Sequence, residues 1–217
     1  MKTEAFFKTY NGITVLKMPE FEFERGKIYA VVGSNGSGKS TLAGILAGTI
    51  LPDSGKRPLK DVSVGFMPQK SFAFRLSARK NILLGGNDSE RADMLMSRLS
   101  ISQLANNKAK SLSGGETARM ALARLLMRRY DIIILDEPSA AMDMESTAAS
   151  EELIRQYCIE CGCAVILVTH SLQQAKRIAD KILFFSDGEL TEYGDKDKLL
   201  SRQETDKFRK FLEFYGQ

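Results

Sequence analysis

The fold class of this 217-residue chain is decided by the stretch Gly33-Ser34-Asn35-Gly36-Ser37-Gly38-Lys39-Ser40-Thr41. It fits the pattern G-x-x-x-x-G-K-S, in which a glycine-rich loop holds phosphate oxygens. The apolar run before it predicts a buried strand over 27–32, and the run after it predicts a helix over 42–46. A phosphate-binding loop needs this position between a strand and a helix.

Each residue type in this loop has a chemical reason. The three glycines let backbone N–H groups converge on phosphate oxygens, and the N-terminus of the following helix adds about half a positive charge. Lys39 brings a full charge to the β- and γ-phosphates, and the Ser40 hydroxyl is a ligand for Mg²⁺. The sequence therefore predicts a nucleotide site with Mg²⁺, formed by every residue from 33 to 41.

Two acids follow a second apolar strand, Ile132–Leu135. Neighbouring residues of a strand point to opposite faces, so Asp136 and Glu137 can do different work. We expect Asp136 to hold the magnesium shell and Glu137 to orient or deprotonate an attacking water. Together with the loop at 33–41, this pair predicts an NTPase.

Bulk composition excludes several classes of protein. The net charge of +4 is modest, far from the dense basic patch of a nucleic-acid binder. The longest apolar runs have the length of strands, and the N-terminus has no apolar signal region. We therefore expect a cytoplasmic protein that needs a separate partner to act on a membrane. Cys158, Cys161 and Cys163 are expected to be reduced, structural thiols.

The remaining pattern predicts one α/β domain over 1–217. Alternating residues in the first thirty positions predict a small antiparallel sheet, and strands then alternate with helices as in a parallel sheet. A mostly helical part is expected over about 71–119, a hairpin over 181–193 and a last helix over 198–215.

The motif Leu112-Ser113-Gly114-Gly115-Glu116 is the most discriminating one, because it resembles the signature sequence of ABC ATPases and precedes Asp136 in the expected order. Ser113 can cap the following helix, and the glycines at 114 and 115 let N–H groups approach a γ-phosphate. The resemblance implies a P-loop NTPase (RecA-like) core with an N-terminal antiparallel β subdomain and a helical ABC-specific insertion. It also implies that Ser113, Gly114 and Gly115 contact the ATP of a second subunit in a head-to-tail dimer.

Further family positions match one by one. Gln69 is similar to the glutamine that touches magnesium and water, and His170 to the switch histidine that contacts the γ-phosphate. Asp143 resembles the aspartate of the dimer-crossing loop. Tyr10 lies where the family places an aromatic ring on adenine, although a core or surface tyrosine also fits there. The chain departs from the family at Thr117-Ala118-Arg119, where glutamines often precede the arginine, at Met142 in place of leucine, and in short stretches before Gln69 and in the helical insertion.

The resemblance implies an ATP-hydrolysing subunit that energises a membrane permease. The compact C-terminus and the lack of a fused membrane segment favour solute import, with a solute-binding protein as an indirect partner. The dimer can be a homodimer or a heterodimer with a paralogue, placed at the inner face of the cell membrane. The alternative is a non-transport ABC ATPase acting on ribosomes or DNA, but such proteins carry tandem cassettes or long coiled coils.

Overall fold

The computed structural model describes residues 1–54 and 58–215 of the chain. Its central feature is an eight-stranded mixed sheet with the strand order β2-β3-β10-β9-β5-β8-β7-β6. The strands of this sheet are β2 (Phe6–Tyr10), β3 (Ile13–Met18), β5 (Ile28–Gly33), β6 (Val64–Met67), β7 (Ile132–Asp136), β8 (Ala164–Val168), β9 (Lys181–Ser186) and β10 (Glu189–Asp195).

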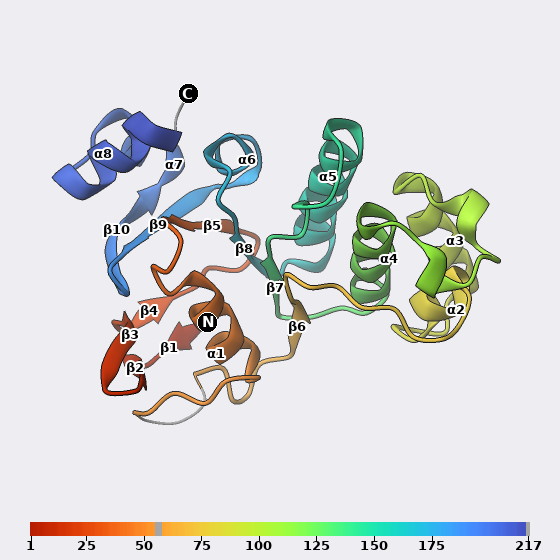
Figure 1. Ribbon diagram of the computed structural model, residues 1–217, viewed down its shortest axis with the longest axis horizontal. Coiled ribbons are helices and arrows are strands. Elements are labelled where there is room, and N and C mark those ends of the chain that lie inside the picture. Colours follow the sequence, from red (N-terminus) through yellow and green to blue (C-terminus); the bar gives the residue numbers. More distant parts are fainter. Residues whose placement is uncertain (55–57, 216–217) are drawn as a thin grey trace.

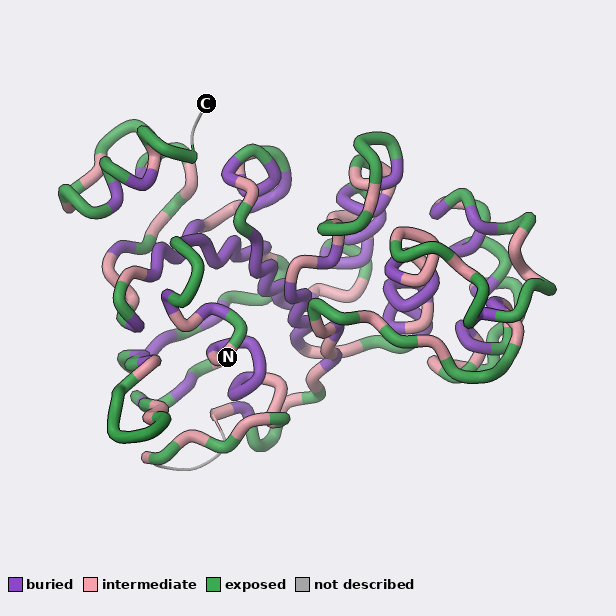
Figure 2. Tube along the Cα trace, viewed as in Figure 1, coloured by how far each residue is buried: buried purple, intermediate pink, exposed green. Residues whose placement is uncertain are grey.

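The five strands from β9 to β6 in this order are parallel to one another. Three of them, β5, β7 and β8, are buried at every residue, as expected for parallel strands covered by helices on both faces. Figure 2 shows this buried centre of the molecule. The continuous apolar runs in the sequence are therefore explained by burial on both sides.

Antiparallel pairing is confined to the ends of the chain. The hairpin β2–β3 is antiparallel and continues the main sheet through a parallel contact of β3 with β10. A separate antiparallel pair joins β1 (Lys2–Thr3) to β4 (Phe21–Glu22). The expected hairpin over 181–193 is present as β9 and β10. The expected N-terminal antiparallel sheet is thus present, but part of it extends the main sheet.

Helices cover both faces of the sheet (Figure 1). Ile133 and Leu135 of β7 face the cluster formed with α4 and α5. The alternate residues Ile132 and Ile134 face the cluster formed with α1. The helices are α1 (Lys39–Ala47), α2 (Ala78–Leu83), α3 (Ser89–Arg98), α4 (Gly114–Leu126), α5 (Met144–Cys161), α6 (Leu172–Ile178), α7 (Lys196–Ser201) and α8 (Asp206–Tyr215).

The helical part lies at one end of the molecule. Figure 1 shows α2 and α3 beyond α4, opposite the end formed by the N-terminal strands and the C-terminal helices. The boundary that we expect at about 71–119 stays a prediction, because α4 runs across it and also packs against β6.

The single helix expected over 198–215 is wrong. The structure has two helices, α7 and α8, separated by residues 202–205. The carboxylate of Glu192, a buried residue of β10, accepts hydrogen bonds from the backbone N–H groups of Glu204 and Thr205 at 3.1 and 2.6 Å. This carboxylate satisfies the backbone where α8 begins, so a new helix starts there instead of continuing from α7.

Candidate active site

The glycine-rich loop connects β5 to α1, as its sequence predicts. Gly33, Gly36 and Gly38 have φ values of 153°, 79° and 92°. A Cβ atom at Gly33 would lie 2.1 Å from the carbonyl oxygen of Phe185, and one at Gly38 would lie 2.6 Å from that of Val15. Neighbouring strands thus leave no room for a side chain at either position. Gly38 is also the N-cap of α1 and has no side chain that could accept hydrogen bonds from the first N–H groups of this helix. These N–H groups can therefore bind an anion.

Lys39 folds back over this loop. Its Nζ donates hydrogen bonds of 2.8 Å to the carbonyl oxygens of both Gly33 and Ser34. The side chain is buried, and this burial lowers the pKa of its ammonium group, against the opposing influence of the Glu137 and Asp136 carboxylates. A phosphate group in the loop would give this buried cation an anionic partner.

The Ser40 hydroxyl lies beside the first of the two acids. Its Oγ donates to Oδ1 of Asp136 at 3.3 Å. Asp136 is 5% exposed, and burial raises the pKa of its carboxyl group, while the hydrogen bond from Ser40 lowers it. A buried carboxylate beside a hydroxyl fits a Mg²⁺ ion that takes its other ligands from phosphate and water. Within 1–54 and 58–215, no three His, Cys, Asp or Glu side chains are grouped to hold a metal ion by themselves.

The second acid has different neighbours. Oε2 of Glu137 lies 3.1 Å from Nδ1 of His170 and accepts a hydrogen bond from Nε2 of Gln69 at 3.3 Å. Its backbone has a φ of 49°, which is uncommon for a residue with a side chain. Its N–H donates to the carbonyl oxygen of Val168 at 2.9 Å, which fixes this conformation.

These groups meet because they follow the carboxyl ends of adjacent parallel strands. The loop follows β5, Gln69 follows β6, the two acids end β7, and His170 follows β8. In open α/β sheets, ligands bind at this edge. The structure therefore brings together residues that the sequence analysis assigned to phosphate, metal and water.

The signature segment, residues 112–116, lies in a different part of the structure from the Lys39 loop. Ser113 caps α4 in a reciprocal capping box with Glu116, as the sequence suggests. A Cβ atom at Gly115 would lie 2.6 Å from the carbonyl oxygen of Ala141, so the start of α4 packs closely on the loop after Glu137. However, α4 and α1 pack on opposite faces of the sheet, and Figure 1 shows them well separated. Ser113 and the glycines at 114 and 115 are therefore not part of the cluster around Lys39.

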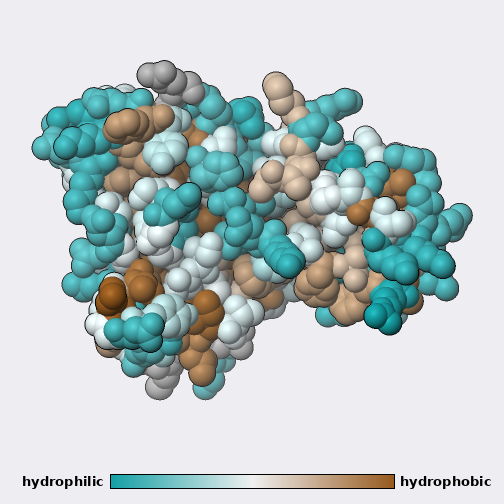
Figure 3. All heavy atoms as spheres, in the orientation of Figure 1, coloured by the Kyte–Doolittle hydropathy of each residue, from teal (hydrophilic) through white to brown (hydrophobic). Residues whose placement is uncertain are grey.

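Two other predicted residues take positions at the surface. Asp143 is the N-cap of α5, and hydrogen bonds from the backbone N–H and then the hydroxyl of Ser146 hold its pKa below the ordinary value. Tyr10 ends β2 and is 46% exposed, next to Ile13 of β3, which is 69% exposed. Figure 3 shows hydrophobic residues gathered over the N-terminal strands, at the lower left. The exposed ring of Tyr10 is compatible with a stacking role, which stays a prediction.

The thiols of Cys158, Cys161 and Cys163 are all free. Cys158 and Cys163 are buried, and Sγ of Cys158 donates to the carbonyl oxygen of Cys163 at 3.3 Å. They pack the end of α5 against the start of β8, in line with the structural role that we expected.

A groove of about 560 Å³ lies between β6 and the helices α2 and α4. The rings of Phe72 and Phe74 stand edge to face in its wall, with centroids 5.3 Å apart. The guanidinium of Arg124 lies 5.2 and 5.3 Å from these two centroids, and Leu84, 48% exposed, lines the same groove. The residues that line this groove include Met67 and Pro68 just before Gln69 and Ser71 just after it, so a partner in the groove would lie close to the edge of the sheet where Gln69 contacts Glu137.

Sequence reasoning missed one feature of the site. Gln174 and Glu151 are buried behind the loop that carries Glu137, and Nε2 of Gln174 donates hydrogen bonds both to Oε1 of Glu151 and to Oγ of Ser139. Polar residues within a helical pattern usually indicate the side of the helix that faces solvent. Nothing in the nearby sequence shows that Gln174 and Glu151 are buried instead.

Comparisons with known proteins agree with this geometry. The sequence profile of the family described as ABC transporter matches residues 16–140. The tungstate uptake system ATP-binding protein of Peptoclostridium acidaminophilum is 35% identical over 202 residues, covering 85% of this chain and 94% of that protein. The thiamine import ATP-binding protein of Jannaschia sp. is 32% identical over 185 residues, covering 76% and 81%. A solved dimeric ATP-binding cassette with ADP and phosphate superimposes with a TM-score of 0.79 at 26% identity, covering 89% and 97%.

The chain belongs to the ABC transporter family and is an ATP-binding subunit of the kind found in these transporters. It is an ATPase with the ABC form of the P-loop fold, so the predicted fold class and enzymatic activity are confirmed. Among the described residues, the structure contains no helix both long and apolar enough to cross a membrane.

Proposed function

We propose that this ATPase drives solute import through a separate membrane permease. The relatives described above are uptake and import ATP-binding proteins by name, and they match most of this chain. The observation that carries the ATP-hydrolysing part of the proposal is the meeting of the Lys39 loop, Asp136 and Glu137 at one edge of the sheet. The chain would then work at the cytoplasmic face of the membrane.

The binding half of the site is formed by the loop at 33–41. Lys39 exchanges its two carbonyl partners for the β- and γ-phosphates of ATP, which are stronger acceptors because they are charged. Ser40, Asp136 and Gln69 would supply the protein oxygens for Mg²⁺. When bound, Mg²⁺ neutralises charge that develops on the phosphate oxygens during hydrolysis.

The hydrolytic half is formed by Glu137 and His170. The Glu137 carboxylate accepts a proton or a hydrogen bond from the attacking water, and Gln69 and His170 keep its Oε2 in place. His170 is 59% exposed, so its imidazole can reach a γ-phosphate in the open edge of the site. We assign the catalytic work to these three residues together with Lys39.

The substitution Glu137→Gln tests this assignment. It keeps the shape of the side chain but removes the acceptor charge, so ATP should still bind while hydrolysis slows by about a thousandfold or more. Fluorescent nucleotide binding and phosphate release measure the two steps separately. Glu152→Gln, an exposed acid on α5, is the matched control and should hydrolyse normally. Wild-type turnover of Glu137→Gln would mean that another residue handles the water.

Each complete site needs two chains. The signature residues Ser113, Gly114 and Gly115 lie away from the Lys39 loop of their own chain, so we infer that they contact the ATP bound by a second subunit. The exposed start of α4 offers N–H groups and a positive helix end to that phosphate. The partner is a second copy of the chain or a paralogue.

The groove beside α2 is our candidate contact for the permease. It is lined mainly by apolar side chains, together with Arg124 and Arg128, and it lies between Gln69 and the signature helix α4, where a moving partner would affect both. Leu84→Asp should break co-purification with a polytopic membrane protein and leave basal ATP hydrolysis within about twofold, because Leu84 is not in the active site. Its matched control is Ile159→Asp on α5, which exposes a similar side chain elsewhere. Unchanged co-purification of Leu84→Asp would refute the assigned groove.

A further inference from the structure

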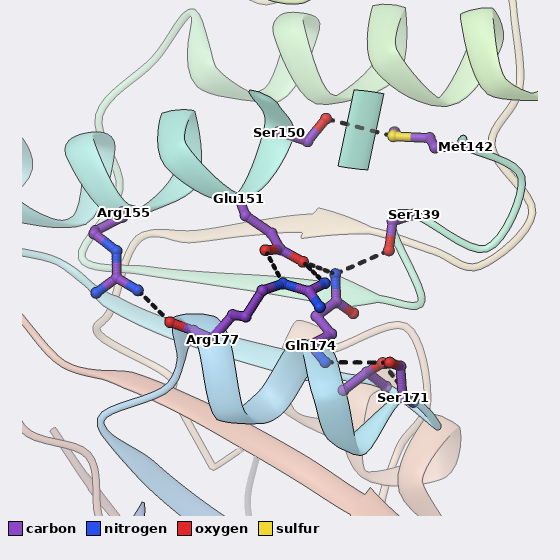
Figure 4. Close-up of polar contacts among 9 residues, drawn as sticks. Ser139, Met142, Ser150, Glu151, Arg155, Ser171, Gln174 and Arg177 are labelled. Carbon is purple, nitrogen blue, oxygen red and sulfur yellow. Dashed lines mark hydrogen bonds and ion pairs between the residues drawn. The ribbon is translucent and has the colours of Figure 1, made fainter. Parts of the chain in front are cut away.

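A buried polar network lies directly behind the catalytic loop (Figure 4). Gln174 of α6 is 3% exposed, and its Nε2 donates to Oγ of Ser139 at 2.9 Å and to Oε1 of Glu151 at 3.2 Å. Glu151 of α5 is buried and holds Arg177 through two hydrogen bonds of 2.9 and 2.7 Å. The network therefore joins α5, α6 and the loop after β7 at one point.

The positions of these residues in the chain connect them to the active site. Ser139 lies two residues after Glu137, in the loop that continues to the N-cap of α5. Gln174 lies in the first turn of α6, which is capped by Ser171, the residue after His170. The contact between Gln174 and Ser139 consequently ties the segment carrying Glu137 to the segment carrying His170.

Further contacts in Figure 4 hold the same three segments. Ser150 of α5 donates to Sδ of Met142 at 3.4 Å, and Arg155 of α5 donates to the carbonyl oxygen of Arg177 at 2.6 Å. The loop between Glu137 and α5 is thus attached to both helices.

An amide at position 174 suits its neighbours. The Glu151 carboxylate is an acceptor only, and it is surrounded by the donors of Arg177 and Gln174. A buried carboxylate is retained at low cost only when such donors surround it. A second carboxylate at 174 would place two acceptors in contact and would leave the loop without its donor, so the identity of this side chain matters for the loop position.

We propose that Gln174, supported by Glu151 and Arg177, is a positioning residue that fixes the distance between Glu137 and His170 for ATP hydrolysis. This inference rests on the proposed catalytic role of Glu137. Gln174 acts through the backbone of the loop and touches no reacting atom. Its loss lowers kcat because misplacing a catalytic group by about 1 Å can cost a factor of about 100. Nucleotide binding depends on the Lys39 loop and is unaffected.

The test compares three variants of the purified full chain. Gln174→Met keeps the volume but removes the donor, and Gln174→Glu adds the conflicting carboxylate. Both should lower kcat by about 10- to 100-fold, with the KM for MgATP changed by less than about twofold. The double variant Glu151→Gln/Gln174→Glu returns one amide and one carboxylate to the contact, with the Ser139 hydroxyl now donating, and should recover most of the lost turnover.

Two comparisons separate positioning from mere stability. Glu192→Gln removes another buried carboxylate, the one that caps α8, and should lower the melting temperature while kcat is unchanged. In a Glu137→Gln background, Gln174→Met should cause little further loss, because it acts through Glu137. The inference would be overturned if the losses in kcat from Gln174→Met and Glu137→Gln multiplied in the combined variant. It would also be overturned if KM rose while kcat was unchanged, or if the double variant Glu151→Gln/Gln174→Glu recovered no turnover. Normal turnover of Glu137→Gln alone would instead overturn the proposed function.

Discussion

At the scale of single residues, the site depends on charged groups that are held by partners they can release. Lys39 is buried against two carbonyl oxygens, and burial lowers the pKa of its ammonium group. Carbonyl oxygens are weaker acceptors for this cation than phosphate oxygens are. The structure thus has Lys39 already placed for its ligand, which lowers the ordering cost of binding.

Lys39→Ala should therefore weaken ATP binding by about 100-fold or more, since hydrogen bonds to a charged group contribute about 1.5–3 kcal/mol each. Equilibrium binding of a fluorescent ATP analogue measures the loss. Lys210→Ala, an exposed lysine on α8, controls for net charge and should bind normally. Normal ATP affinity in Lys39→Ala would contradict the phosphate-binding assignment.

The local sequence predicts the glycine-rich loop that holds Lys39, because a phosphate-binding loop needs particular residue types at fixed spacing. It does not identify Gln174, whose partners Ser139 and Glu151 are 35 and 23 residues away in the chain. The left-handed backbone of Glu137 is equally invisible in the sequence, since it is imposed by a hydrogen bond to the neighbouring strand β8.

At the scale of elements, the prediction succeeds where burial alone determines the structure. Strands β5, β7 and β8 are continuous apolar runs because both faces are covered. The division of the last helix into α7 and α8 depends on Glu192 of β10, a contact that periodicity within 198–215 does not contain. The ends of elements are therefore set by distant polar groups.

Asp131 is such a polar group, at the start of β7. Its carboxylate accepts hydrogen bonds from Nη2 of Arg25 at 2.5 Å and from the N–H of Ser63, before β6, at 3.0 Å. Arg25 first, and then the Ser63 N–H, hold the pKa of this carboxyl below its ordinary value. A lowered folded-state pKa stabilises the protein above the unfolded pKa of about 3.9, and this stability is lost as the pH falls through the folded-state value.

Asp131→Asn should accordingly lower the free energy of unfolding at pH 7 by about 1 kcal/mol, a figure reduced for the partial exposure of the pair. The difference from wild type should shrink as the pH falls below the unfolded pKa of about 3.9 and towards the lower folded-state pKa, because proton binding to the unfolded chain begins first and then removes the charge from the folded protein. Urea unfolding at several pH values measures it. A difference that is the same at pH 7 and pH 3 would show that the charge of Asp131 is not responsible.

At the scale of the whole molecule, each proposed ATP site is complete only when two chains associate. Helix α1, which begins at Lys39, and the signature helix α4 pack on opposite faces of the sheet, so in the proposed dimer each chain would offer one half of each site. The sequence predicts this through family resemblance, and the distance between the halves in the structure supports it. ATP hydrolysis would then require dimerisation around two nucleotides.

Mixing two inactive variants tests whether the ATP sites are shared between two chains. Ser113→Arg should bind ATP as a monomer but fail to hydrolyse it, while Lys39→Ala should fail to bind it. A mixed dimer contains one site built from the intact Lys39 loop of the first chain and the intact Ser113 of the second. ATP hydrolysis should therefore reappear on mixing, up to about half the wild-type rate per dimer if the two sites act independently. Absence of hydrolysis in mixtures shown to form the mixed dimer would contradict the composite site.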